Sequence, residues 1–198
     1  MDYFIKLFER LYCILIFKSN KRDIKLSIQK NKINEIINEI HEVFGDVPFP
    51  NHCGWNAAIA MDDWIDDPIE LMNITKEKDI HDKWWNIPSE ELKDCYMAQC
   101  YLDAKGVIFY LPAYLVLVLN DTKGLSHGTL ISWLLPPSKN SEFELYSYFL
   151  EIFSILNKNQ KNVCLKVLSY IKEHTNDDNI NYEQQDINDI LQHNFWVN

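Results

Sequence analysis

The sequence VIFYLPAYLVLVL, from Val107 to Leu119, decides the fold of this chain because it contains no charged residue. A helix that crosses a membrane needs roughly 20 apolar residues, so a segment this short is typical of a buried core element. The N-cap residue Asp103 precedes it, and the pattern predicts a helix from about Ala104 to Leu119. Pro112 lacks the N–H that a helix interior requires, so we expect a kink there or two short helices. Two strands interrupted at the proline are the alternative, which the β-branched residues favour.

Segments on both sides of this stretch have the spacing of amphipathic helices. Residues 2–17 predict an N-terminal helix, and the polar sequence at 19–25 predicts a turn after it. The clearest amphipathic face comes next and ends at Gly45, a typical residue after a helix. Its apolar residues follow the i, i+3, i+4 spacing: Ile33, Ile36, Ile37, Ile40, Val43 and Phe44.

Capping residues predict where several other helices begin. Asp67 before Pro68 is typical of a helix start, and Ser89 predicts a helix that runs to about Leu102. Two capping boxes precede the last helices, Ser141 with Glu144 and Asn157 with Gln160. The tail at 174–198 is acidic, and its last residues have the pattern of a short docked helix.

These patterns predict a single, mainly α domain over residues 1–198, in which amphipathic helices surround a kinked apolar central helix. Only 5 glycines and 7 prolines in 198 residues favour helices over a turn-rich β-sandwich. One short β element is left open at residues 126–135, because the apolar run there fits a strand or a helix equally well.

The net charge of −10 excludes some classes of function. Nucleic-acid binders usually carry a basic face, so we expect no nucleic-acid partner. The apolar part of residues 11–17 is too short to span a membrane, and no small-residue cleavage site follows it, which argues against a signal peptide. Five cysteines without regular spacing indicate reduced thiols, and we expect a cytoplasmic protein. A peripheral membrane helix at residues 2–17 is the minority interpretation.

The order of the motifs resembles an uncharacterised bacterial family, the domain-of-unknown-function 6714 family. The resemblance rests on a helix and turn from Ile36 to Pro50, the FYLPAYL motif at 109–115, the WLLPP motif at 133–137 and a final helix from Phe153 to Ile171. It covers residues 33–173 and implies a fold boundary but no activity.

Two groups of residues have the composition of metal ligands. Paired carboxylates at Asp62 and Asp66, with Asp63, Asp67 and Glu70 nearby, suit Mg²⁺ or Mn²⁺ if a helix aligns them. His52 and Cys53 with Cys95 and Cys100 are the zinc alternative, although adjacent residues are poorly placed to bind one ion. Solvated carboxylates and buried thiols explain both groups more simply, so the sequence predicts no metal and no cofactor.

No catalytic residue is identified from the sequence. Cys53 has four histidines available as bases, His41, His52, His81 and His127, but nothing in the sequence brings them together. Gly-rich phosphate loops and the GxSxG and HExxH motifs are absent, which favours a protein that is not an enzyme.

The remaining candidate is a surface in which tryptophans alternate with acidic residues. Trp supplies binding energy at interfaces, and carboxylates attract a basic partner. The function predicted is therefore a non-enzymatic protein-binding module, for example an immunity-type protein that neutralises a basic toxin. The alternative is a metal-dependent hydrolase that uses the carboxylates from Asp62 to Glu70. A third interpretation buries the tryptophans in the core. The predicted partner-binding residues are Trp55, Asp62, Asp63, Trp64, Asp66, Asp67, Trp84 and Trp85.

Overall fold

The computed structural model describes residues 2–50, 53–79, 82–93, 97–121, 124–138, 143–174 and 181–197. Side chains are described from residue 23 onward, except those of residues 143, 144, 181 and 182. The chain divides into two compact units, Met1–Ile36 and Ile37–Asn198.

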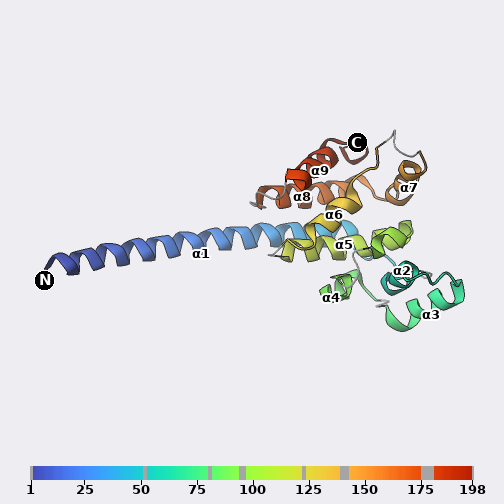
Figure 1. Cartoon of the computed structure of the whole chain (residues 1–198), viewed down its shortest axis with the longest axis horizontal. Coiled ribbons are helices and arrows are strands. Elements are labelled where there is room, and N and C mark those ends of the chain that lie inside the picture. Colours follow the sequence, from blue (N-terminus) through green and yellow to red (C-terminus); the bar gives the residue numbers. More distant parts are fainter. Residues whose placement is uncertain are drawn as a thin grey trace. The chain divides into compact units, whose positions relative to one another are not determined.

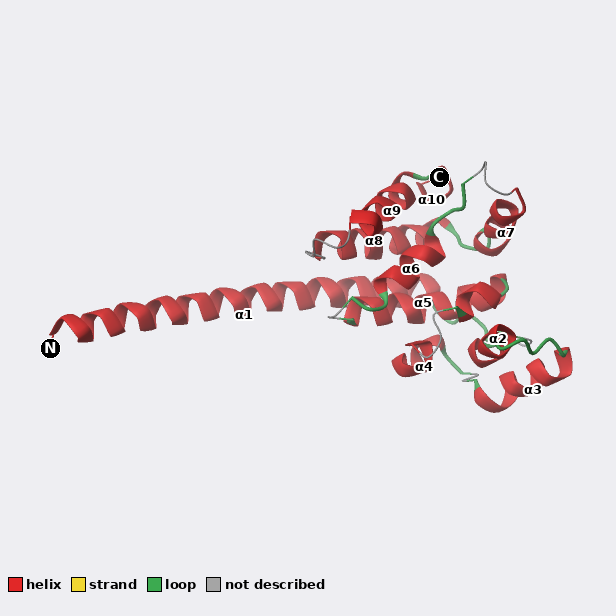
Figure 2. Ribbon diagram, in the orientation of Figure 1, coloured by secondary structure: helices red, strands yellow, loops and turns green. Residues whose placement is uncertain are grey.

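Every regular element within the described ranges is helical, which confirms the predicted fold class (Figures 1 and 2). The apolar run at residues 126–135 forms a helix, which answers the open question between strand and helix. The elements in chain order are α1 (Asp2–Phe44), α2 (Trp55–Asp62), α3 (Pro68–Lys78), the 3₁₀ helix η1 (Trp84–Asn86), α4 (Ser89–Lys93), the 3₁₀ helix η2 (Ala98–Tyr101), α5 (Ala104–Asn120), α6 (His127–Leu134), α7 (Phe143–Phe153), α8 (Lys158–His174), α9 (Asn181–Gln192) and α10 (Asn194–Val197).

The central element of the second unit is α5, as its apolar sequence predicts. Asp103 caps it by accepting a hydrogen bond from the Gly106 N–H at 2.7 Å. The helix continues through Pro112, which is buried inside it, so the predictions of two short helices or two strands are wrong. Packing offsets the hydrogen bond lost at the proline, because η1, α4, α6, α7 and α8 all lie against α5. Figure 2 shows α5 between α6 and α8 on one side and α2 and α4 on the other.

Helix α1 is unbroken from Asp2 to Phe44, so the predicted turn at residues 19–25 is wrong. No glycine or proline occurs before Gly45, and polar residues such as Lys and Arg are good helix formers. The helix ends where predicted: Gly45 has φ +49° and donates its N–H to the His41 carbonyl at 2.9 Å. A residue without a Cβ adopts this left-handed conformation without strain.

The C-terminal helices complete the core of the second unit. The predicted capping box at the start of α8 is confirmed, since Asn157 and Gln160 exchange two hydrogen bonds of 3.0 Å. The short helix predicted over residues 187–197 is divided in the structure between the end of α9 and α10, and α10 packs against α8 and α9. Trp196 on α10 is 1% exposed and donates its indole N–H to the Leu134 carbonyl at 3.0 Å. This tail is therefore part of the folded unit.

One predicted helix is shorter than its sequence indicates. The helix that begins at Ser89 ends at Lys93, and Leu102 lies in extended backbone after η2. Ala98 and Gln99 are buried, and η2 packs against α2, so tertiary packing overrides the local helical preference there. The predicted capping box of Ser141 and Glu144 falls outside the described residues.

Candidate functional site

The most unusual exposed feature of the second unit is the turn between α2 and α3. Helix α2 ends in a Schellman motif, in which the Ile65 N–H donates to the Ala60 carbonyl at 3.0 Å and the Trp64 N–H donates to the Met61 carbonyl at 3.1 Å. This motif requires one left-handed residue, usually glycine. Here that residue is Trp64, with φ +67°.

Trp64 occupies this position at an energetic cost and without burial. A left-handed backbone costs a residue with a Cβ roughly 1–2 kcal/mol. The side chain of Trp64 is 94% exposed, so packing offsets none of that cost. It is the only residue other than glycine with a positive φ in the described part of the chain. Strain of this kind at a fully exposed aromatic residue is typical of a functional position.

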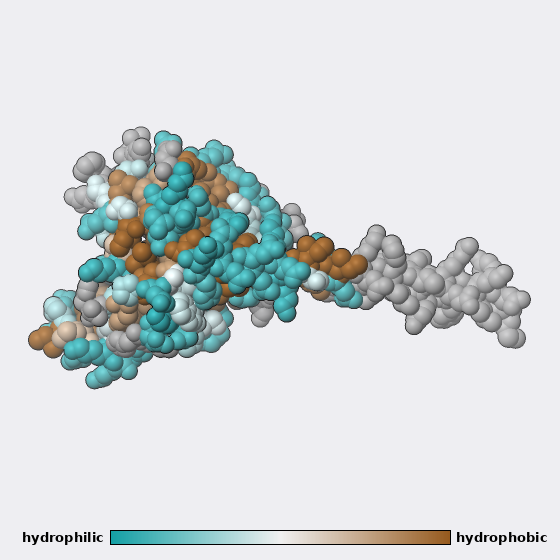
Figure 3. All heavy atoms as spheres, turned by 180° about the vertical axis from the view of Figure 1, so that it is seen from behind, coloured by the Kyte–Doolittle hydropathy of each residue, from teal (hydrophilic) through white to brown (hydrophobic). Residues whose placement is uncertain are grey.

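Acidic residues flank this tryptophan in the sequence. Asp63, Asp66, Asp67 and Glu70 are exposed, and no Lys or Arg occurs from residue 55 to residue 75. We call Asp63, Trp64, Asp66, Asp67, Ile69 and Glu70 the acidic loop. Ile69 is 66% exposed and adds apolar surface that sequence reasoning missed. Figure 3 shows hydrophobic side chains over the first turn of α3, beside hydrophilic ones.

Two of the predicted site residues have structural roles. Asp67 caps α3, because its Oδ1 accepts hydrogen bonds from the N–H groups of Ile69 at 2.8 Å and Glu70 at 2.9 Å. Asp62 accepts a hydrogen bond from the Tyr101 hydroxyl at 3.1 Å, which ties the end of α2 to η2. The side chains of Asp63, Asp66 and Glu70 are exposed, so their carboxylates face solvent.

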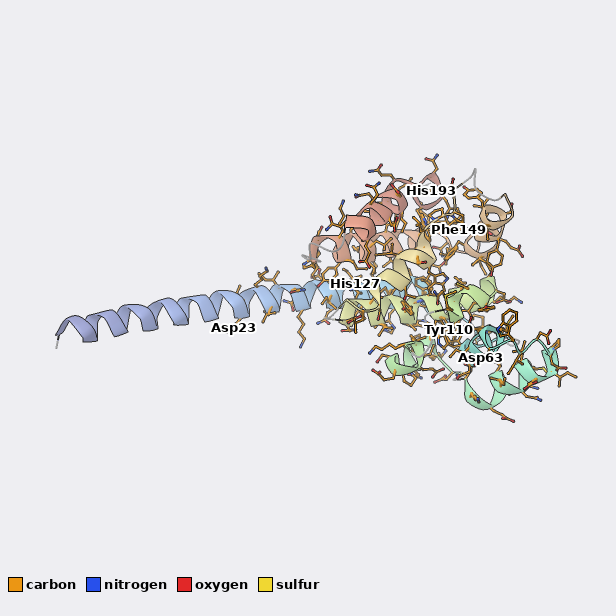
Figure 4. The ribbon with its side chains drawn as sticks, in the orientation of Figure 1. Asp23, Asp63, Tyr110, His127, Phe149 and His193 are labelled. Atoms are coloured by element: carbon orange, nitrogen blue, oxygen red, sulfur yellow. The ribbon has the colours of Figure 1, made fainter. Side chains whose placement is uncertain are left out.

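The other end of α2 is fixed to the core by three backbone N–H groups. Gly54 donates to the Thr75 hydroxyl at 3.0 Å, Trp55 to the Tyr110 hydroxyl at 2.9 Å, and Asn56 to Asp79 Oδ1 at 2.9 Å. We call this set of bonds the α2 lock. Figure 4 places Tyr110 on α5 and Asp63 at the far end of α2. The lock thus joins the helix that carries the acidic loop to the central helix.

Gly54 is required in the α2 lock because the backbone and Asp79 approach closely. A Cβ at residue 54 would lie 2.0 Å from Asp79 Oδ2, a distance that no real pair of atoms tolerates. Asp79 is 6% exposed and also accepts a hydrogen bond from the Asn56 side chain at 3.0 Å. A carboxylate held by N–H donors at a helix N-terminus is a stabilising arrangement.

The four predicted tryptophans separate into two buried and two exposed residues. Trp55 is fully buried and Trp84 is 1% exposed, with its indole N–H donated to the Gly45 carbonyl at 2.9 Å. Neither contributes to an exposed surface, so the interpretation that the tryptophans are buried in the core holds for these two. Trp64 and Trp85, which is 40% exposed, are the rings that face solvent.

Trp85 borders a cleft of about 730 Å³. Tyr114, Ser126 and the exposed Leu125 lie in its lining. Burial raises the pKa of Tyr114. The cleft has the size of a small-molecule site. It was not apparent from the sequence, because its walls come from segments far apart in the chain: His41, η1, α4, α5, and residues 125–129.

The two groups weighed as alternative metal sites do not assemble among the described residues. Helix α2 ends at Asp62, so Asp66 lies in the loop and the two do not share a helical face. No group of three or more His, Cys, Asp or Glu side chains in the described ranges is placed to hold an ion. His52, His81 and Cys95 lie outside those ranges.

The surroundings of Cys53 disfavour the reactive thiolate form of its side chain. Burial, then the negative charges of Asp103 and Asp79, raise the pKa of its thiol to about 11. The reactive form of cysteine is the thiolate, which is scarce at neutral pH in such an environment.

Residues 32–198 match the family of unknown function DUF6714, and the chain belongs to this family. The match starts where the motifs predicted but extends to residue 198, so the predicted end at residue 173 is wrong. The docking of α10 explains why the tail belongs to the family domain. Neither the curated proteins nor the solved structures contain a significant match to the chain. Within the described residues, no helix has both the length and the apolar character needed to cross a membrane.

Proposed function

We propose that this chain is a non-enzymatic protein-binding module whose acidic loop binds a basic protein partner. The observation that carries the proposal is Trp64, which is 94% exposed in a left-handed backbone conformation. An immunity-type protein that covers the basic surface of a toxin is one form of such a module.

The strain at Trp64 supports a role in binding. Stability alone favours glycine at this position, because the indole buries no surface and the backbone is strained. Exposed Trp is among the residues that contribute most to protein interfaces when a partner covers it. Ile69 provides a second apolar contact on the same loop.

The charges of the acidic loop support a basic partner. Asp63, Asp66 and Glu70 are exposed and lie close to Trp64 in the sequence, and no Lys or Arg occurs from residue 55 to residue 75. Such a surface attracts a positively charged protein over distances of about 8–10 Å at moderate salt and repels acidic ones. The α2 lock holds this surface on a fixed helix, so binding orders few additional residues.

No observation favours the metal-dependent hydrolase considered from the sequence. Asp62 and Asp67 hold structural hydrogen bonds, and the helical alignment on which that idea depended is not formed.

The test is affinity capture by the full chain, followed by measurement of binding to the protein captured. The first variant is Trp64→Gly, and the second combines Asp63→Asn, Asp66→Asn and Glu70→Gln. A control with Glu42→Gln, Glu77→Gln and Glu151→Gln removes the same number of exposed carboxylates elsewhere.

We expect the wild type and the control to retain a basic protein that both variants lose. A Trp at the centre of an interface contributes about 2 kcal/mol or more, so Trp64→Gly should raise Kd by roughly thirtyfold. A partner that both variants bind as tightly as the wild type does would refute the proposed site.

A further inference from the structure

The N-terminal part of α1 lies outside the region that matches the family. The family match begins at residue 32 and leaves the preceding 31 residues outside it. The compact unit Met1–Ile36 consists, by itself, of helix α1 alone. A single helix encloses no core, so its apolar residues find no burial within their own unit.

The sequence of this N-terminal segment has an apolar part followed by a basic part. Twelve of the fifteen residues from 3 to 17 are apolar. Residues 18–32 contain six Lys or Arg and one acidic residue, a net charge of +5. Residues 33–198 carry a net charge of −15, so the basic part stands apart from the rest of the protein in its charge.

Described side chains in the basic part show exposed apolar surface beside lysines. Ile24 is 61% exposed, Leu26 53% and Ile28 64%. Lys25 and Lys30 are exposed next to them. Figure 3 shows hydrophobic side chains beside hydrophilic ones on the described part of α1, and Figure 4 labels Asp23 at the start of the same stretch.

A second copy of the chain is a poor binding partner for this helix. Coiled-coil pairing needs an apolar position every three or four residues along the seam. Residues 18–23 are all polar, which is nearly two helical turns. Every possible seam is therefore interrupted between the apolar run and Ile24.

We propose that residues 2–32 dock the protein on an anionic lipid surface. An apolar helix too short to span a bilayer inserts along the interface, and an adjacent cluster of four to eight Lys or Arg is attracted to acidic headgroups. Two such signals together are what stable peripheral binding requires. This site is independent of the acidic loop, and it leaves the acidic family domain free to meet a protein partner.

The test is sedimentation of the full chain with vesicles of phosphatidylcholine, alone or with one-third phosphatidylglycerol. The charge variant combines Lys18→Gln, Lys21→Gln, Arg22→Gln and Lys25→Gln. The control removes four exposed lysines outside α1 and combines Lys76→Gln, Lys78→Gln, Lys105→Gln and Lys158→Gln. A third variant, with Phe8→Ser, Leu11→Ser and Leu15→Ser, tests the apolar part, and circular dichroism compares its helix content with that of the wild type.

The wild type and the control should sediment with the anionic vesicles but not with the neutral ones, and 0.5 M salt should release them. Each basic residue near an anionic surface strengthens binding roughly fivefold, so the charge variant should bind at least a hundredfold more weakly. The apolar variant should also lose binding.

Equal binding to neutral and anionic vesicles, or no binding to either, would overturn the proposal. Binding that the charge variant retains would overturn it as well, whatever the folding of the apolar variant. A dimer seen by light scattering, with no sedimentation of the wild type on vesicles, would assign the segment to a second copy instead.

Discussion

Replacing Trp64 with glycine should make the protein more stable. The left-handed backbone costs a residue with a Cβ roughly 1–2 kcal/mol, while glycine lowers stability by roughly 0.5–1 kcal/mol through the entropy of the unfolded chain. The ring is 94% exposed, so its removal exposes almost no new apolar surface. The net expectation for Trp64→Gly is a gain of about 0.5–1 kcal/mol in the free energy of unfolding.

Thermal and urea denaturation measure this gain. For a protein of this size, 1 kcal/mol corresponds to a shift in Tm of about 2–4 °C, so Tm should rise by about 1–4 °C. Trp64→Ala is the matched control, because it removes the ring and keeps a Cβ in the strained conformation. It should leave the stability within about 0.5 kcal/mol of the wild type.

Two results would refute the reasoning. A loss of stability in both variants would mean that the indole packs against the protein and is not an exposed ring. Equal stability of the two variants would mean that the left-handed backbone is not strained by a side chain. Either result would remove the main argument for a binding role of Trp64.

Three further predictions concern the core of the second unit. Gly54→Ala should lower the free energy of unfolding by about 2 kcal/mol or more in urea denaturation, because the new Cβ overlaps Asp79 and forces the α2 lock apart. Asp103→Ala should cost about 1 kcal/mol in the same assay through loss of the cap on α5, and Asp103→Asn should restore most of it. Cys164 is buried, and burial raises the pKa of its thiol from 9.0 to about 12. As the pH rises, the thiol loses its proton at a lower pH in the unfolded chain than in the folded one. The neutral Cys164 thiol therefore contributes its full stabilisation of the folded state below pH 9, and this stabilisation is lost as the pH rises toward 12. The decrease in Tm between pH 9 and pH 11 should therefore be smaller in Cys164→Ala than in the wild type, and an equal decrease would contradict the assignment.

Features that depend on local geometry could be predicted from the sequence. The predicted caps at Asp67, Asp103 and the Asn157–Gln160 pair are confirmed. They could be predicted because each one joins a side chain to a backbone N–H only two or three residues away. The burial of α5 is confirmed as well. It could be predicted because a helix of uncharged, apolar residues is stable in water only when other elements cover it.

Features that depend on packing between distant segments could not be predicted from the sequence. Trp55 and Trp64 belonged to one predicted surface, yet one ring is fully buried and the other is 94% exposed. The difference is set by Tyr110 and Thr75, which hold the start of α2 against the core and leave its end outside. The Schellman motif at Trp64 could not be predicted from the sequence, because the left-handed position of this motif usually carries glycine.

The continuity of α1 was missed for a different reason. A polar stretch predicts a turn when it contains glycine, proline or several small polar residues, and residues 19–25 contain Ser19 and Asn20 but neither glycine nor proline. Lys and Arg in the same stretch continue a helix well.

The α2 lock has a kinetic consequence for any partner of the acidic loop. Because its first three N–H groups donate to side chains from α3, the end of α3 and α5, helix α2 cannot fray from its N-terminus without breaking contacts to the core. A partner then meets a loop whose geometry exists before the encounter, and association includes no slow folding step. The association rate constant should accordingly fall steeply with added salt, whereas the dissociation rate constant should depend mainly on the indole that the partner covers.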